Sequence, residues 1–258
     1  MDNQSILKSF MVRDKLNPKI WELPNERFMS DPKGQVETMV PKVRERLLDI
    51  ANQFVEFLDV PVFVDDVIMT GSLANYNWSN YSDVDLHIIV DFTQFPEEQI
   101  ELFQKLFTLK KILFNTNHDI TIKNFEVELY AQDEKEIHTS SGVYSVLYDE
   151  WITKPEKINV KVDNTVLMNK VKSWTEKIDE VIEDVKESND LEKSKEIIDK
   201  LKKKLKDYRK EGLSGDGEFS YENLVFKFLR RNGYISKLEN FKNKFVDKKL
   251  SLEQENKE

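Results

Sequence analysis

Hydrophobic residues recur at spacings of three and four between residues 40 and 58, which is typical of an amphipathic helix. This helix should end near Asp59. The positions on its predicted apolar face are Val43, Leu47, Ile50, Phe54 and Phe57.

Apolar, β-branched segments after this helix predict strands. VPVFVDDVIMTG ends at a glycine, DVDLHIIVDF follows it, and DITIKNFEVELYAQ indicates two strands joined at Lys123 and Asn124. Between them, PEEQIELFQKLFTLKKILF predicts a helix with a proline in its first turn and lysines near its end, where they match the helix dipole. Strands and helices therefore alternate through this half of the chain.

The character of the chain changes along its length and predicts four segments. Residues 1–39, rich in prolines and turn formers, should form an irregular arm anchored by Trp21 and Phe28. Residues 40–160 should form one domain and residues 161–248 a helical domain, with breaks at 211–220 and 231–233. Residues 249–258 are charged and should form a flexible tail.

Composition restricts the class of protein. The chain has 258 residues, no cysteine and three histidines, which excludes a disulfide framework and a thiolate zinc site. We see no secretory leader and no apolar run near the ~20 residues of a membrane span. We expect a soluble protein of the cytoplasm, neither secreted nor bound to a membrane.

The charge is acidic overall, at −9, which argues against a protein that coats nucleic acid. Between residues 200 and 231, however, ten basic residues stand against five acidic ones. This basic stretch is either a solvated helix face or the wall of a site that receives phosphates. Within it, a helix starting at Ser220 should bury Leu224, Val225, Phe226 and Phe228 and leave Lys227, Arg230 and Arg231 on its exposed side.

Two aspartates lie inside an apolar strand, where an ionised carboxylate is costly to bury unless something compensates its charge. Asp83 and Asp85 should project from one face of that strand with backbones ~6.6 Å apart. A divalent cation would remove their repulsion, and Mg²⁺ prefers a few carboxylates completed by water and phosphate oxygens. A bound metal is therefore the expected compensation.

The glycine and serine before these aspartates suit phosphate binding. Gly71 allows a close approach of the backbone, and Ser72 should begin one or two helical turns whose N–H groups and hydroxyl hold phosphate oxygens. A third acid would allow two metal ions, as in-line phosphoryl displacement uses them. In FEVELY we prefer Glu128, which sits deeper in the run, with Glu126 as the rival.

These motifs together resemble the active-site signature of the polymerase beta-like nucleotidyltransferase superfamily: Gly-Ser, ten residues, Asp-Val-Asp, then a later acid flanked by apolar residues. The segments LNPKIW, GSLANYN, SDVDLHIIVDF, EVELYAQD and ENLVFKFLRRNGYI look similar to uncharacterised nucleotidyltransferases of tailed bacteriophages. The resemblance implies an α+β fold, with a mixed sheet flanked by helices and followed by a C-terminal helical domain, as in CCA-adding enzymes and oligoadenylate synthases. It also implies a viral protein, located in the host cytoplasm.

The resemblance further implies a function. Asp83, Asp85 and Glu128 would be catalytic and hold two Mg²⁺ or Mn²⁺ ions, and Gly71 and Ser72 would bind a nucleoside triphosphate such as ATP. A nucleoside monophosphate would pass to a hydroxyl of an RNA end (a short RNA or tRNA), a nucleotide, a protein or a small molecule. The alternative is an inactive, nucleotidyltransferase-like binding or structural protein of the virion.

Other candidate residues have two interpretations each. His87 lies on the face of the two aspartates and either touches the substrate or is a structural histidine. Tyr144 either stacks on a nucleobase or fills the core. Ser140 and Ser141 either bind a ribose or phosphate or belong to a plain loop.

Overall fold

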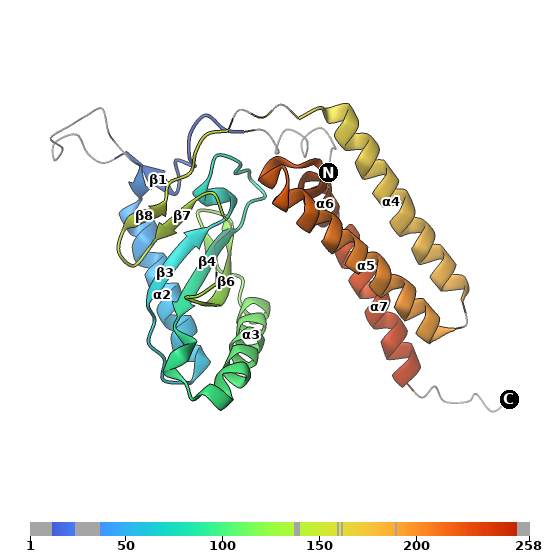
Figure 1. Cartoon of the computed structure of the whole chain (residues 1–258), viewed down its shortest axis with the longest axis horizontal. Coiled ribbons are helices and arrows are strands. Elements are labelled where there is room, and N and C mark those ends of the chain that lie inside the picture. The colour runs from blue at the N-terminus through green and yellow to red at the C-terminus, as the bar shows by residue number, and fades with distance from the viewer. Residues whose placement is uncertain are drawn as a thin grey trace. The chain divides into compact units, whose positions relative to one another are not determined.

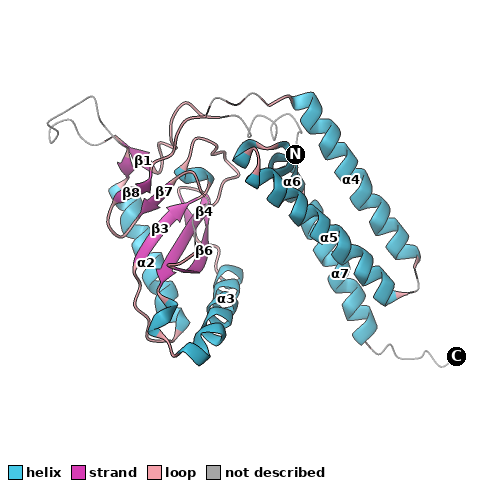
Figure 2. Ribbon diagram, in the orientation of Figure 1, coloured by secondary structure: helices cyan, strands magenta, loops and turns pink. Residues whose placement is uncertain are grey.

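The computed structural model describes residues 12–23, 37–136, 140–158, 160, 162–188 and 190–251. The chain divides into two compact units, one formed by residues 11–159 and the other containing residues 160–258. All of the described strands lie in the first unit, and the described part of the second consists of helices and turns (Figures 1 and 2). The division falls beside the boundary predicted between residues 160 and 161, and the observed architecture is α+β.

A mixed six-stranded sheet forms the centre of the first unit (Figure 1). Its strand order is β5-β6-β4-β3-β7-β8, and β4 pairs with β6 in parallel while the other neighbours are antiparallel. The strands are β3 (Asp66–Thr70), β4 (Val84–Val90), β5 (Thr121–Ile122), β6 (Phe125–Asp133), β7 (Val143–Ser145) and β8 (Glu150–Thr153).

Two helices, α2 (Pro41–Leu58) and α3 (Ile100–Asn117), pack in the same hydrophobic core against one face of this sheet. The predicted apolar face of α2 is buried except for Phe57, which is partly buried, and Asp59 ends the helix in the left-handed conformation. Helix α3 connects β4 to β6, because parallel neighbours need a crossover rather than a tight turn. The other sheet face carries polar side chains together with a small buried apolar cluster, Ile68, Ile89 and Val143.

The alternation of side chains along β4 separates the two faces. Val84, Leu86, Ile88 and Val90 have no exposed surface and belong to the core with α2 and α3. Asp85 and His87 therefore project from the opposite face. The seven residues of β4 thus place four buried apolar side chains on one face and two polar side chains, Asp85 and His87, on the other.

Several elements differ from the sequence predictions. Strand β3 begins only at Asp66, and Ser72–Ala74 forms a single 3-10 turn (η3) rather than a helix of one or two turns. The proline before α3 precedes a 3-10 turn, Glu97–Gln99 (η5), and no lysine lies in the last turn of α3, which extends to Asn117. Strands β7 and β8 were not predicted at all.

The N-terminal segment contributes more structure than an irregular arm. Its strands β1 (Trp21–Glu22) and β2 (Thr38–Met39) pair with each other, and Trp21 is buried, as predicted for an anchor. Trp21 stacks on Trp151 with ring centroids 4.5 Å apart and donates a 2.7 Å hydrogen bond to the Leu73 carbonyl. The second predicted anchor, Phe28, lies outside the described residues.

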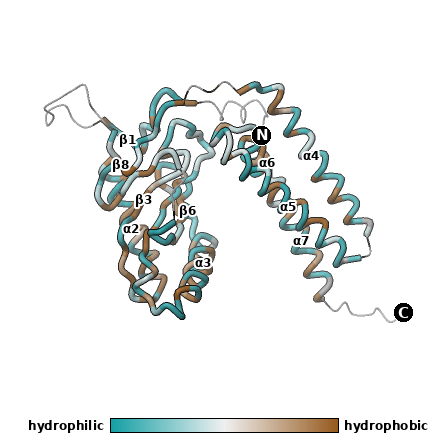
Figure 3. The backbone as a smooth tube through the Cα atoms, in the orientation of Figure 1, coloured by the Kyte–Doolittle hydropathy of each residue, from teal (hydrophilic) through white to brown (hydrophobic). Residues whose placement is uncertain are grey.

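The second unit contains α4 (Asn164–Glu187), α5 (Leu191–Ser214), the 3-10 turn η6 (Gly217–Phe219), α6 (Tyr221–Arg231) and α7 (Tyr234–Leu250). The longer helices alternate between hydrophilic and hydrophobic stretches along their length (Figure 3), as amphipathic helices do. Ser220 caps α6 by accepting from the Asn223 N–H. Helix α7 runs two residues into the segment predicted as a tail, and residues 252–258 of that tail lie outside the described part.

The basic residues of α6 are less exposed than predicted. Arg230 is exposed, as the sequence predicted, but Lys227 and Arg231 are half-buried. The expectation of a fully solvated basic face is therefore wrong for these two residues.

None of the described helices combines the length and apolar character needed to cross a bilayer.

Candidate functional site

The parallel pairing of β4 with β6 brings the predicted acids together. Asp85 is the register partner of Glu128, and partners in adjacent strands project from the same face. Asp83 lies one residue before β4, and continuing the register places it beside Glu126. The four carboxylates therefore stand in two rows on the face opposite α2 and α3.

The two glutamates are not equivalent. Glu128 is half-buried beside Asp85, which is also half-buried, whereas Glu126 is exposed. A carboxylate beside a partly buried acid experiences stronger electrostatic interaction than one in open solvent. This geometry supports the preference for Glu128, and the choice between them stays a prediction.

A pocket of about 270 Å³ opens at this end of the sheet. Asp83, Glu126 and Glu128 line it, together with side chains that sequence reasoning missed: Asn115, His118, Asp119, Ile120 and Val127. The missed ones lie mainly at the end of α3 and just beyond it, where the sequence shows no motif that would link them to the aspartates. Four acids and one histidine line the pocket, so an anionic substrate would be repelled unless cations neutralise the carboxylates.

Asn115 attaches α3 to the strand that carries the glutamates. Its Nδ2 donates to the Leu129 carbonyl at 2.9 Å, and its Oδ1 accepts from the Leu129 N–H at 3.1 Å. The amide thus pairs with β6 as a neighbouring strand would, at a point beyond the end of β5. This contact fixes the end of α3, which lines the pocket, relative to β6, which carries Glu126 and Glu128.

Gly71 lies directly against Asp85. Its φ of 76° and ψ of −163° belong to a region that side chains almost exclude, and a Cβ at this position would overlap the Asp85 carboxylate. The glycine is therefore required both by its own backbone and by the position of an acid on the neighbouring strand. Thr70, the preceding residue, is the register partner of Asp85.

The turn after Gly71 is held by serines. The Ser72 hydroxyl donates to the Ser82 hydroxyl at 2.7 Å, and the Ser82 hydroxyl accepts from the Ser79 N–H at 2.9 Å. These bonds tie the start of the turn to the residue that precedes Asp83. Gly71, Ser72 and the two aspartates thus form one connected structural group, although the turn is too short to act as a helix terminus.

His87 makes the contacts of a structural histidine. Its Nε2 lies 3.1 Å from the Thr70 hydroxyl and its Nδ1 lies 2.7 Å from the Gln132 Oε1. The ring stacks on Tyr130 with centroids 4.6 Å apart. These contacts connect β3, β4 and β6 at His87, two residues after Asp85 on the same face of β4.

Tyr144 belongs to the core. It is fully buried, and its hydroxyl donates to Asp149 at 2.7 Å and accepts from the Met39 N–H at 3.3 Å. Burial and the bond to Asp149 raise the pKa of Tyr144 far above its ordinary value. The interpretation of this tyrosine as a nucleobase platform is therefore wrong, because no face of its ring is accessible.

The two serines after the undescribed residues 137–139 belong to a loop. Ser140 donates to the Gly142 carbonyl at 3.0 Å, and Ser141 accepts from the Asn75 side chain. These bonds are those of a loop that packs against the turn after Gly71. They do not form a ribose or phosphate site by themselves.

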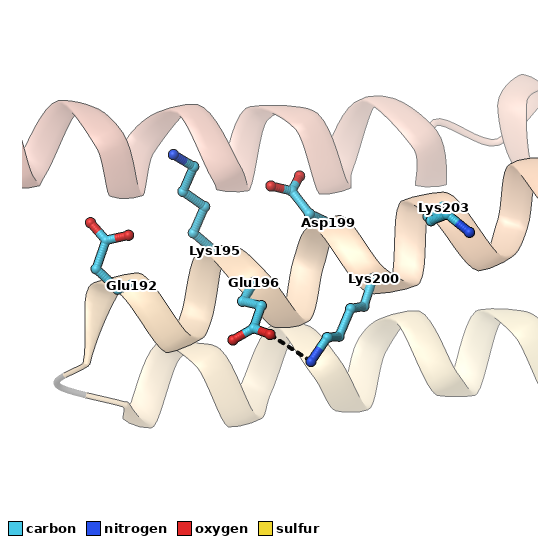
Figure 4. Close-up of a pocket in the computed structure, with 6 residues that line it drawn as sticks. All are labelled: Glu192, Lys195, Glu196, Asp199, Lys200 and Lys203. Atoms are coloured by element: carbon cyan, nitrogen blue, oxygen red, sulfur yellow. Dashed lines mark ion pairs between the residues drawn. The ribbon is translucent and has the colours of Figure 1, made fainter.

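A second pocket, of about 380 Å³, lies along α5 in the helical unit (Figure 4). Its lining side chains all come from this one helix: Glu192, Lys195, Glu196, Asp199, Lys200 and Lys203. Lys200 pairs with Glu196 at 2.6 Å, and Asp199 pairs with Lys242 at 2.6 Å. Charges that neutralise one another in this way are typical of a solvated helix surface.

Compared with family models, curated proteins and solved structures, the chain gives no match in any of the three. Its function must therefore be argued from the site itself.

The donor set of the acidic site fits a hard divalent cation, because Mg²⁺ prefers carboxylate oxygens. Asp83, Asp85 and Glu128 supply such oxygens from one sheet face. Within the described part of the chain, no three acids or histidines are already gathered at the spacing of a finished metal site. The fit of this site to Mg²⁺ therefore rests on the carboxylate chemistry of the three residues and on the register between β4 and β6.

Proposed function

We propose that the chain is a magnesium-dependent nucleotidyltransferase of the polymerase beta-like type. The observation that carries the proposal is the register of β4 with β6, which sets Glu128 beside Asp85 on the sheet face away from the helices. Gly71, pressed against Asp85, adds the turn that such an enzyme uses for phosphates.

In the proposed reaction, an acceptor hydroxyl attacks the α-phosphorus of a nucleoside triphosphate. A new oxygen–phosphorus bond forms, the bond between the α-phosphorus and the bridging oxygen breaks, pyrophosphate leaves, and the hydroxyl proton passes to solvent. Asp83, Asp85 and Glu128 would hold two Mg²⁺ or Mn²⁺ ions, which supply positive charge for the phosphates and the nucleophile. The chain's own part is to fix these carboxylates on adjacent strands.

The turn from Gly71 to Ala74 would orient the triphosphate. Its glycine removes side-chain bulk beside Asp85, and the Ser72 hydroxyl, bonded to Ser82, is held in a defined position. Such preorganisation lowers the entropy cost of binding a flexible polyphosphate. The acceptor hydroxyl could belong to a short RNA or tRNA end, a nucleotide, a protein or a small molecule.

The test measures pyrophosphate release from labelled nucleoside triphosphates with Mg²⁺ or Mn²⁺, with and without RNA. Asp83→Asn combined with Asp85→Asn should abolish transfer and divalent-ion binding. The matched control combines Glu97→Gln with Glu98→Gln. It also removes two carboxylate charges, but from an exposed turn. The control should retain full activity.

The same double variant should melt at an equal or higher temperature than the wild type without divalent ions, because it removes carboxylate repulsion. A folded double variant that still transfers nucleotide would refute the proposal. Absence of transfer by the wild type with every class of acceptor would favour the non-catalytic alternative.

A further inference from the structure

Helix α3 of the first unit has two apolar sides. On one side, Phe107 and Phe114 are buried in the core that α3 shares with α2 and the sheet. The second side lies about 120° around the helix and carries four leucines at spacings of four, three and four residues. We call this set the leucine stripe: Leu102, Leu106, Leu109 and Leu113.

The leucine stripe lies at the surface. Leu102 is 64% exposed, Leu109 65% and Leu113 49%, and Leu106 is partly buried. Ile112, beside the stripe, is 52% exposed. Single exposed apolar side chains are common on proteins, but a contiguous row of them marks a surface that binds something. Packing within the core of the first unit does not account for this row.

The spacing of the stripe is the same in both directions along the helix. A second copy of α3 that runs antiparallel therefore presents an identical row of leucines. A two-fold axis at the middle of the stripe sets Leu102 against the partner's Leu113. The same axis sets Leu106 against the partner's Leu109. Spacings of four and three are those of the apolar residues in paired helices, and contacts in which one patch binds itself are the commonest in homo-oligomers.

Two lysines that flank the stripe on opposite sides favour the antiparallel orientation. Lys105 precedes Leu106, and Lys110 follows Leu109. In a parallel pair of helices, Lys105 of each copy would lie beside the partner's Lys110, and these like charges repel. In an antiparallel pair, Lys105 lies beside the partner's Ile112 instead. Lys110 then lies beside the partner's Phe103, so lysine does not face lysine on either side.

The charges along the length of the helix favour the same orientation. Three acids, Glu97, Glu98 and Glu101, lie just before α3 and in its first turn, and Lys110 and Lys111 lie in its second half. Antiparallel copies bring the acidic start of each helix toward the basic half of the other. This arrangement is electrostatically complementary, and it also opposes the two helix dipoles.

We propose that the leucine stripe of α3 is the interface through which two copies of this chain form an antiparallel, two-fold dimer. Association removes the exposed leucines of both copies from water, which is the main driving force for such contacts. The interface consists of one helix from each copy, so its dissociation constant should lie in the micromolar range of a reversible dimer. The dimer is independent of the proposed nucleotidyl transfer.

The experiment measures the mass of the full chain by sedimentation velocity as its concentration is raised through the micromolar range. The wild type should change from monomer to dimer. Leu109→Glu should weaken association by about 10-fold or more, because it places a carboxylate inside an apolar contact. The matched control is Gln104→Glu, which adds the same charge at an exposed position on the opposite side of α3 and should change affinity by less than about 2-fold.

Melting curves recorded at a concentration where every variant is monomeric show whether each variant is folded. Because Leu109 is exposed, Leu109→Glu should not lower the melting temperature. A wild type that stays monomeric throughout the micromolar range would overturn the proposal. So would a folded Leu109→Glu variant that associates as tightly as the wild type.

Cysteine cross-linking tests the orientation of the two helices, because the chain contains no cysteine of its own. Leu102→Cys, mixed with an affinity-tagged Leu113→Cys chain, should form a disulfide between the two variants under mild oxidation. Each variant alone should cross-link much more slowly, since the two copies of residue 102 lie about 16 Å apart along the helix axis. Faster cross-linking of Leu102→Cys with itself than with the other variant would overturn the antiparallel arrangement.

Alkylation of the thiol in Leu109→Cys distinguishes a second copy from cover supplied by the same chain. Protection of this thiol should rise with protein concentration, in step with the change from monomer to dimer. Protection that is equal at every concentration would overturn the proposal and show that another part of the same chain covers the stripe. Rapid alkylation at every concentration would overturn it as well, because the stripe would then stay open to solvent.

Discussion

Replacing Gly71 by alanine tests the contact between the turn and Asp85. The backbone at φ 76° and ψ −163° is strained for any residue with a Cβ, at a cost of about 1–3 kcal/mol. The new methyl group must also displace the Asp85 carboxylate, whose Cγ would lie 2.8 Å from it. Forcing that side chain off its rotamer adds roughly 0.5–1.5 kcal/mol. We expect Gly71→Ala to lower the free energy of unfolding by about 2–4 kcal/mol.

A double-mutant cycle separates the two costs. An Asp85→Ala background removes the carboxylate and leaves the residue-85 Cβ at 3.3 Å from the new methyl group, so Gly71→Ala should then cost mainly the backbone part. The coupling between the substitutions should therefore be about 1 kcal/mol. Gly233→Ala is the control for a glycine with positive φ and open space, since its φ is 75° and nothing lies within 4 Å of a Cβ there. It should cost about 1–2 kcal/mol.

Denaturant unfolding followed by tryptophan fluorescence measures these values. Trp21, Trp78 and Trp151 report on the unit that contains Gly71, and Trp174 reports on the helical unit. If Gly71→Ala costs the same with and without the Asp85 carboxylate, the steric argument is refuted. A cost no larger than that of Gly233→Ala would refute the backbone argument as well.

Three further predictions follow from the site, the core and the helical unit. Glu128→Gln should reduce transfer by about 100-fold or more and Glu126→Gln only slightly, measured as pyrophosphate release, and the reverse order would exchange their roles. Tyr144→Phe should cost about 1–2 kcal/mol in an unfolding titration with nucleotide affinity unchanged, because it removes the hydrogen bond that the buried Tyr144 hydroxyl donates to Asp149. The pKa of Lys227 is near 8 in the folded chain and 10.5 ordinarily, so the unfolded chain binds more protons between these values and stability should rise from pH 8 to pH 10.5. Lys227→Met should remove this rise and increase the melting temperature at pH 7, and a lower melting temperature would mean that the lysine is structural.

Local patterns predicted the elements that carry their own periodic signal. The apolar face of α2 and the turn at Lys123 and Asn124, both with positive φ, follow from spacing and turn chemistry alone. The β7 and β8 strands have three and four residues, too few for a periodic signal, and they form through pairing with distant β3 and with each other.

The candidate site was predictable in residue type but not in geometry. Asp83, Asp85 and Glu128 were identified from their charge within apolar segments, whereas the pairing of Asp85 with Glu128 depends on sheet register. The overlap of Gly71 with Asp85 also joins residues on different strands, so no local pattern could reveal it. Lys227 was misplaced because helical spacing cannot show what packs against a polar face.

The crossover through α3 also determines when the acidic group is completed during folding. Strands β3 and β4 are antiparallel neighbours in sequence, whereas β6 pairs with β4 across a longer connection that contains α3. Closing this longer connection is entropically slower than forming a hairpin. Electrostatic repulsion between Glu128 and Asp85 thus arises only when β6 docks on β4. The residues that define the site therefore oppose this pairing step, and counter-ions in solution would speed it.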